Sequence, residues 1–349
     1  MKKNTKMRTA GIMAAAAVAT VLGTLGAAYA ATEDSALYMI VDLTKSLGSS
    51  GQITYIDESE LTNGVWGTWV RNPVTNRDAV IQSVIWTGVT NGTTYKTDKL
   101  VLRRIPAGSY YEGDEGDGNN ATNVILTKDQ YVGVFEVTQQ QWNRVMNDGT
   151  GTGTQAKHTV SYYDIRENSD NTAIDPHWPQ TNAVGSTSFI GKLRAVTGIE
   201  FDLPTEGQWE YACRAETTTY YNDGLATSLA SQLDVLGWYN GSVPKPTAAQ
   251  LVGGLLPNAW GLYDMHGNVW EWCLDWYASS PEIGIDPDGA DSGSSRVRRG
   301  GSWRNAASIC RSAYRNYYTP SYRLSYVGFR LVSTLPPLIP ITGTLNILR

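Results

Sequence analysis

The stretch RGGSW at positions 299–303 leads into CRSAYR at positions 310–315 and ends in GFR at positions 328–330. Gly, Arg, Trp and Phe recur there at regular-looking points, and Tyr, Ser and other small residues fill the positions between them. This pattern predicts a rigid frame, formed by the recurring residues, that carries a surface where many residue types are tolerated. The rest of the sequence has to decide whether that surface belongs to an enzyme or to a binding protein.

Residues 1–30 have the pattern of a signal peptide. A basic start is followed by an apolar stretch at positions 10–25, and Ala28-Tyr29-Ala30 has the small-x-small form of a cleavage site. A membrane anchor is the alternative, but the apolar part is short and rich in Ala and Gly for a spanning helix. We therefore expect a bacterial protein exported to the periplasm, the cell surface or the medium. No membrane span is expected after cleavage.

The charge of the chain argues against one class of partner. The 349 residues carry a net charge of −5, which becomes −9 when the four basic residues of the signal segment are removed. A nucleic-acid partner would need a basic face, so we expect none. We expect a monomer whose partner is a protein or a glycan.

The chain has only three cysteines. In an exported protein they allow one disulfide, and the matching Cys-Arg dipeptides at Cys213 and Cys310 favour that pair. Cys273, between Trp272 and Leu274, is expected to be a buried apolar residue. The three histidines are scattered, so we expect no zinc site.

The pattern of predicted secondary structure changes at Lys99. Residues 31–98 show short β-like runs broken by Gly, Asn and Ser turns, which predicts a small β-rich appendage. Residues 99–333 mix strands with few helices and much irregular chain, which predicts one α+β domain. Residues 334–349 form a Pro-rich tail.

Capping patterns predict three helices in this domain. Thr138 and Gln141 have the spacing of a capping box, and Thr205 and Gln208 repeat it. A further helix is predicted from an N-cap at Ser186 to about residue 196. In the helix after Thr205, Glu206 and Glu210 share one face, where structural ion pairs are more common than acid–base catalysis.

Four ordered motifs together resemble one family. They are YVGVFEVTQQQW (131–142), LPTEGQWEYACR (203–214), PNAWGLYDMHGNVWEW (257–272) and the segment 298–332. Over residues 100–332 the chain is similar to the formylglycine-generating-enzyme family, also called the sulfatase-modifying-factor family. The resemblance implies a C-type-lectin-like fold with little regular structure. The family contains copper-dependent oxidases that convert a sulfatase cysteine to formylglycine, iron enzymes, and members without known catalysis.

The resemblance fails where the oxidases bind copper. Their first copper-binding cysteine would fall near Asn305 and the second a few residues later, and neither is present in this chain. Thiolates select Cu(I), and an amide does not replace them, so we expect no copper site. Ser302 and Trp270 nevertheless retain the scaffold of that site. A formylglycine-generating oxidase, or another enzyme that uses the same cleft, remains the alternative.

A structural calcium site is also implied by the resemblance. Asp264, Gly267, Val269 and Glu271 match positions where the family binds Ca²⁺ through two side chains and two backbone carbonyls, and oxygen donors suit that ion. His266 would lie near it. The alternative is that Asp264 caps a turn and Glu271 pairs with an arginine.

The residues between the fixed points of the C-terminal segment predict a binding surface. Tyr, Ser and Asn dominate there, as in binding loops, where Tyr provides rigid contact area and Ser and Asn provide adaptable hydrogen bonds. The segment resembles the variable regions that bacterial retroelements diversify. The expected ligand-binding residues are Asn305, Tyr314, Asn316, Tyr317, Tyr318, Tyr322 and Tyr326. The arginines at 311, 315, 323 and 330 are expected to belong to the frame, where they would donate to loop carbonyls.

Overall fold

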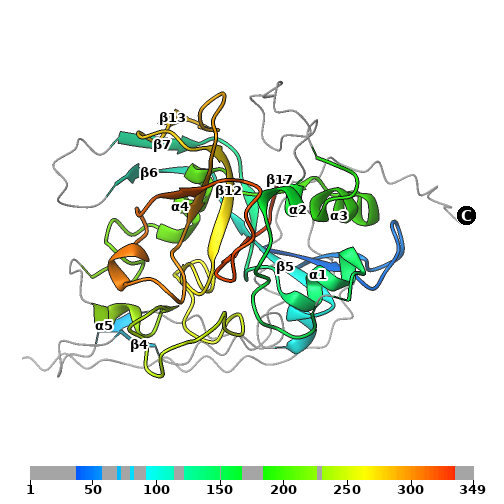
Figure 1. Ribbon diagram of the computed structural model, residues 1–349, viewed down its shortest axis with the longest axis horizontal. Coiled ribbons are helices and arrows are strands. Elements are labelled where there is room, and N and C mark those ends of the chain that lie inside the picture. The colour runs from blue at the N-terminus through cyan, green and yellow to red at the C-terminus, as the bar shows by residue number, and fades with distance from the viewer. Residues whose placement is uncertain are drawn as a thin grey trace, which may run out of the picture. The chain divides into compact units, whose positions relative to one another are not determined.

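The computed structural model describes residues 37–56, 69–71, 79–81, 92–113, 122–149, 151–166, 184–225 and 230–334 (Figure 1). The predicted signal peptide and nearly all of the predicted Pro-rich tail lie outside these residues. Within the described part, no helix is both long enough and apolar enough to cross a membrane.

The largest sheet is antiparallel throughout and has the strand order β2-β1-β5-β8-β17-β9. Its strands are β2 (Ile53–Ile56), β1 (Tyr38–Asp42), β5 (Lys99–Ile105), β8 (Gln130–Gly133), β17 (Val332–Thr334) and β9 (Phe201–Asp202). The prediction that residues 31–98 form an appendage is wrong for the first two of these strands. Four of the five β1 residues are buried, and β1 pairs with β2 on one side and with β5 on the other, so it completes the main sheet.

A second sheet, of order β15-β14-β12-β16, carries the C-terminal motif. Its strands are β15 (Asn316–Tyr318), β14 (Arg296–Arg299), β12 (Trp270–Trp276) and β16 (Val327–Gly328). β12 pairs antiparallel with β14 and parallel with β16, so the last two family motifs lie side by side. The register of β12 against β14 shifts between Trp272 and Trp276.

Three small sheets complete the strand inventory of the described residues. They are β13-β7-β6 (Gly284–Ile285, Thr122–Leu126 and Gly108–Glu112), β10-β11 (Gly237–Trp238 and His266–Gly267) and β3-β4 (Trp69–Arg71 and Ala79–Ile81). Short strands in several sheets and few helices agree with the predicted α+β class.

The helices begin where their caps direct. α1 (Gln139–Met146) and α4 (Glu206–Arg214) both have the complete capping box predicted for Thr138 and Thr205. α3 (Phe189–Thr197) is capped by Ser188 instead of the predicted Ser186, because the Ser188 hydroxyl accepts the backbone N–H of Gly191. α2 (Tyr162–Arg166), α5 (Ala230–Leu233) and the 3₁₀ turns η2 (Thr93–Lys96) and η4 (Ala307–Ile309) are short.

Aromatic side chains form much of the core. The Trp142 ring on α1 stacks on Phe189 of α3 with centroids 5.0 Å apart, and Phe329 packs edge-on against both. Trp270 and Trp272 of β12 lie in the same cluster and are almost completely buried. Burial of such rings stabilises the fold through the area they remove from water. In Figure 1, β12 runs through the middle of the domain, and α4 packs against β12 and β14.

Candidate functional site

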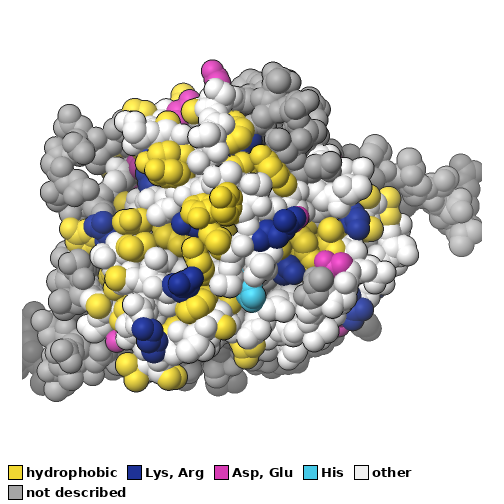
Figure 2. Space-filling view, in the orientation of Figure 1, with side chains coloured by type: hydrophobic (Ala, Val, Ile, Leu, Met, Phe, Trp, Pro, Cys, Tyr) yellow, Lys and Arg dark blue, Asp and Glu magenta, His cyan; other side chains and the backbone are white. Residues whose placement is uncertain are grey.

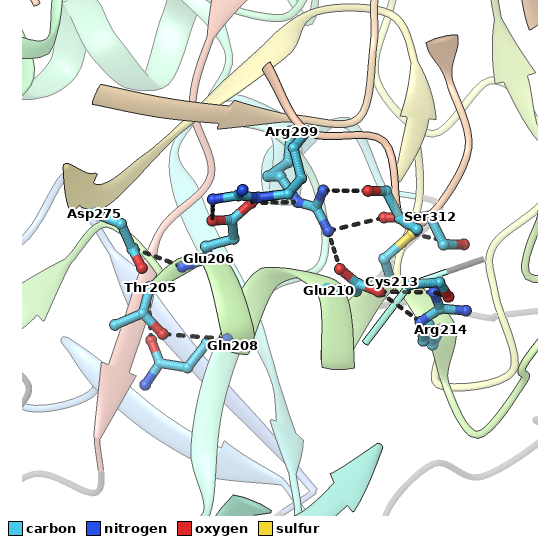
Figure 3. A network of polar contacts seen from close by, with 12 residues as sticks. Thr205, Glu206, Gln208, Glu210, Cys213, Arg214, Asp275, Arg299 and Ser312 are labelled. Atoms are coloured by element: carbon cyan, nitrogen blue, oxygen red, sulfur yellow. Dashed lines mark hydrogen bonds and ion pairs between the residues drawn. The ribbon is translucent and has the colours of Figure 1, made fainter. Parts of the chain in front are cut away.

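A buried ion network holds the C-terminal segment against α4 (Figure 3). The Arg299 guanidinium forms an ion pair with Glu210 and donates to the carbonyl oxygens of Ser312 (3.0 Å) and Ala313 (2.9 Å). Glu210 also pairs with Arg214 at 2.7 Å. The two carboxylates of this helix face are therefore structural, as the sequence predicts, since Glu206 pairs with Arg315.

A second buried pair fixes the end of the same segment. Arg330 donates to both carboxylate oxygens of Glu271 (2.8 and 3.1 Å) and to the carbonyl oxygens of Gly133 and Tyr263 (both 2.7 Å). Trp209 donates its indole N–H to Glu271 as well, at 2.7 Å. Four loop and strand segments thus meet at one guanidinium, which explains how chain with so little regular structure is held in place.

The other arginines assigned to the frame occupy its edge. Arg315 donates to the carbonyl oxygens of Ala278 and Ser279, and Arg311 donates to that of Ser308. Arg323 pairs with the carboxylate of Asp164 and makes no such carbonyl contact in the described residues. The prediction of donation to loop carbonyls is confirmed for Arg311, Arg315 and Arg330.

Two of the predicted ligand-binding tyrosines are well exposed. Tyr317 is 48% exposed and Tyr322 is 52% exposed. The ring of Tyr317 stacks on Tyr277 with centroids 3.9 Å apart, and Tyr322 packs edge-on against Tyr318 at 5.0 Å. These contacts hold the rings in place while one face or edge stays open to solvent, which reduces the entropy lost on binding.

The remaining candidates are partly buried and more firmly attached. Tyr314 packs against Trp270, with ring centroids 6.2 Å apart. Tyr326 lies next to Arg304, whose guanidinium carbon is 4.8 Å from the ring centroid. Asn316 accepts a hydrogen bond from Arg298 at 3.2 Å.

Asn305 belongs to the frame. Its side-chain oxygen accepts the Ser302 hydroxyl at 2.6 Å, and its carbonyl accepts the backbone N–H of Asn240 at 2.8 Å. An amide committed to these bonds does not offer the soft donor that Cu(I) requires. The nearest thiol in sequence, Cys310, is fully buried, and burial raises its pKa to about 12. The residues present do not fit a copper ion.

The predicted disulfide between Cys213 and Cys310 is wrong. Both thiols are free and buried. Cys213 lies 3.7 Å from the hydroxyl of Ser312, whereas Cys310 packs against the backbone of Gly301. The matching Cys-Arg dipeptides reflect the arginine frame and not a bond between the sulfurs. Cys273 is buried in a hydrophobic cluster, as predicted.

Cys213 and His266 lie close together, but their surroundings suppress reactivity. The thiol is 3.9 Å from the imidazole, and both side chains are fully buried. One ring nitrogen of His266 contacts the Cys310 carbonyl at 2.7 Å, and the other accepts the N–H of Asn222 at 3.2 Å. Burial lowers the pKa of His266 to about 4 and raises that of Cys213 to about 12. A thiolate nucleophile with a histidine base is not supported here.

The residues of the expected calcium site are all buried. Glu271 makes the arginine pair of the alternative interpretation, and Asp264 accepts the backbone N–H of Gly253 at 2.6 Å. The other oxygen of Asp264, Oδ1, is buried without a hydrogen-bond partner. Burial raises the pKa of Asp264 to about 6.

Among the described residues, the carboxylates Asp264, Glu136 and Glu271 outnumber the cations Arg330 and Lys96 that act on them. Burial raises the pKa of the neighbouring Glu136, and Asp264 and Glu271 raise it further, while Arg330 opposes them. Lys96 is the other cation that acts on Asp264. Among the residues described, no three Asp, Glu, His or Cys side chains form a metal-binding group. A cation would therefore depend on backbone carbonyls, including those proposed at Gly267 and Val269.

Two features of this region were not found from the sequence. Tyr277, which supports Tyr317, lies outside the C-terminal segment and carries no motif. An acidic cavity of about 240 Å³ lies at the start of α4, lined in part by Glu206, Asp275, Glu282 and Asp291. Burial, with the nearby Glu206, raises the pKa of Asp275 to about 8. The residues that line this cavity come from segments far apart in the sequence, so no local sequence pattern predicts it.

Sequence comparisons agree with this architecture. The family described as "Sulfatase-modifying factor enzyme 1-like domain" matches residues 89–335. The chain is 34% identical over 173 residues to a formylglycine-generating enzyme of Thermomonospora curvata, a match that covers 44% of this chain and 53% of that enzyme. The enzyme of Bos taurus is 34% identical over 161 residues, with 40% of each chain covered. The chain thus spans about half or less of the length of these two curated relatives.

Solved structures share the fold over a wider range. Treponema denticola variable protein 1 superposes with a TM-score of 0.53 at 27% identity, covering 68% of this chain and 95% of that one. PvdO from Pseudomonas aeruginosa has a TM-score of 0.54 at 21% identity, covering 67% and 94%. With the family match over residues 89–335, these likenesses establish that the chain belongs to the sulfatase-modifying-factor, or formylglycine-generating-enzyme, family.

Proposed function

We propose that the protein is an exported, non-catalytic member of this family that binds a ligand through its C-terminal tyrosines. The observation that carries the proposal is the pair of half-exposed rings Tyr317 and Tyr322, held by Tyr277 and Tyr318. Below them lies a frame of buried arginine–carboxylate pairs. Such a frame tolerates change at the surface because its stability comes from other residues.

The likeness to the Treponema variable protein supports this proposal. That chain is covered almost entirely and is named for its variability. The proposed domain architecture is the C-type-lectin-like fold, in which irregular chain of this kind carries binding loops. Fold alone does not fix function, so the surface residues have to be tested directly.

The chemistry of the donors argues against formylglycine formation. The oxidases of the family bind copper through a pair of cysteines, whereas this chain has Asn305 and one buried thiol in that region. Incubation of the purified protein with Cu(I), oxygen and a peptide that carries the sulfatase motif should yield no formylglycine by mass spectrometry. Detection of that product would refute the non-catalytic assignment.

Binding itself can be tested on arrays of proteins and glycans. Tyr317→Ala and Tyr322→Ala should remove binding to any ligand that the unmodified protein captures. Tyr111→Ala is the matched control, because Tyr111 on β6 is 60% exposed and lies outside the C-terminal segment. Equal loss in all three variants would contradict the assignment of the surface.

Calcium is proposed as a structural ion at Asp264. The unpartnered Oδ1 and the surplus of buried carboxylates support it, since a hard cation takes oxygen ligands. Asp264 and Glu271 would supply the side-chain donors, and the carbonyls of Gly267 and Val269 would supply the others. When bound, the ion would neutralise charge and hold the start of β12 in place.

A further inference from the structure

Positive charge is concentrated in the segment that carries the proposed binding surface. Residues 296–330 contain eight arginines and no Asp, Glu or Lys, in a chain whose net charge is −5. Figure 2 shows Lys and Arg side chains spread among hydrophobic ones over one face, where fewer Asp and Glu side chains are visible. Six arginines of the described residues are buried: Arg166, Arg214, Arg296, Arg298, Arg299 and Arg330.

Arg298 differs from the other buried arginines. Four of them form ion pairs with Asp or Glu, and Arg296 has Asp275 within electrostatic reach. Arg298 is only 6% exposed, its Nη1 has no hydrogen-bond partner, and none of the described carboxylates pairs with it. Burial of an unpaired charge costs free energy, so a bound anion that paired with this guanidinium would offset that cost.

Aromatic rings pack against the buried guanidinium of Arg298. Its guanidinium carbon lies 4.9 Å from the centroid of Trp270 and 4.8 Å from that of Tyr318. Burial lowers the pKa of Arg298, while Tyr326 and Tyr318 oppose that effect. Ring faces stabilise a cation without neutralising it, so the positive charge stays available to a carboxylate.

Arg304 approaches the same tyrosine. The guanidinium carbon of Arg304 is 4.8 Å from the centroid of Tyr326, and that of Arg298 is 6.0 Å from it. Arg304 is exposed, and the structure gives it ring contacts but no carboxylate partner within the described part of the chain. One exposed and one buried guanidinium therefore flank a single half-buried ring.

We propose that Arg298 and Arg304, together with Tyr318 and Tyr326, recognise an Asp or Glu side chain of a protein partner. This inference rests on the proposed binding function and names the chemistry of its ligand. Carboxylates form charge-assisted hydrogen bonds with guanidinium groups, and these are stronger when water is excluded. Tyr, Trp and Arg are also the residues that dominate the energetics of protein–protein contacts, whereas Lys, Glu and Asp are depleted there.

The proposal can be tested with an array of short Tyr- and Ser-containing peptides, each made in a Glu form and a matching Gln form. The full-length protein should bind a subset of the Glu peptides and lose about 10-fold or more in affinity for their Gln forms. Arg304→Gln should cause a loss of similar size. Arg298→Lys should also weaken binding, because Lys keeps the charge but lacks the planar fork.

Arg323→Gln is the matched control, since it removes one charge from the same segment but its guanidinium already pairs with Asp164. An equal loss in this variant would show a general charge effect and overturn the site. Equal binding of Glu and Gln peptides, or no binding of either, would overturn carboxylate recognition. Binding to polygalacturonate alone, with loss in Arg304→Gln, would overturn the protein partner in favour of an acidic glycan.

The tyrosine variants separate this proposal from the function on which it rests. Loss of peptide binding in Tyr317→Ala and Tyr322→Ala, without loss in Arg304→Gln, would leave the binding surface standing and refute the arginine site. Circular dichroism of Arg298→Lys shows whether that variant is folded. The exposed position of Arg304 keeps the test decisive if it is not.

Discussion

Replacement of Glu210 by Gln should destabilise the whole domain. Glu210 is 0% exposed, and its carboxylate pairs with Arg214 at 2.7 Å and also with Arg299. Gln is similar in shape but removes the charge and turns an N–H₂ donor toward guanidinium donors. Loss of one partner from a buried ion pair costs about 3–5 kcal/mol of unfolding free energy.

For a domain of this size, such a loss of unfolding free energy lowers the melting temperature by a measurable amount. At roughly 2–4 °C per kcal/mol, the melting temperature should fall by about 6–20 °C. Thermal unfolding followed by circular dichroism, with urea unfolding for the free energy, measures the change. Peptide binding should weaken as well, because Arg299 also holds the carbonyls of Ser312 and Ala313 at the base of the surface.

A surface pair provides the control. Glu200 pairs with Arg194 at 2.9 Å, but its side chain is 39% exposed. Glu200→Gln should cost less than about 1 kcal/mol, because solvent screens such pairs. If Glu210→Gln and Glu200→Gln cost the same, the buried network does not hold the frame and the reasoning fails.

Four further outcomes are expected. The Asp275 carboxyl titrates near 3.8 when unfolded but keeps its proton to about pH 8 when folded, so its stabilising contribution is lost as the pH rises between these values. Asp275→Asn should therefore gain stability relative to the unmodified protein between pH 5 and pH 8, and a pH-independent difference in urea midpoints would contradict this. A calcium chelator should lower the melting temperature of the unmodified protein but not that of Asp264→Asn. An unchanged melting temperature in both proteins would refute the calcium proposal. Tyr317→Ala and Tyr322→Ala should each change the unfolding free energy by less than about 1 kcal/mol, since about half of each ring is already in water. Dithiothreitol should leave the melting temperature unchanged, because the three thiols are free; a fall would restore the disulfide.

Local signals in the sequence were sufficient for several parts of the fold. The capping boxes at Thr138 and Thr205 depend on residues three positions apart, and both form as predicted. Ser186 and Ser188 are equivalent caps by residue type, and α3 uses Ser188, two residues after the predicted position. The short β-like runs in residues 31–98 predict strands there but not the pairing of β1 with β5, since strand pairing depends on residues distant in the chain.

Residue types and short spacings are sufficient to predict the family, the starts of α1 and α4 and the chemical character of the C-terminal surface. Tertiary structure decided which charges are neutralised. Arg299 and Arg330 pair with carboxylates 89 and 59 residues away in the chain, whereas Arg298, one residue before Arg299, pairs with none of the carboxylates that the structure describes. Successive side chains on a strand point to opposite faces, so neighbours in sequence meet different surroundings. Arg299 therefore belongs to the frame, whereas Arg298 packs against Trp270 and Tyr318 with no carboxylate partner in the described part of the chain.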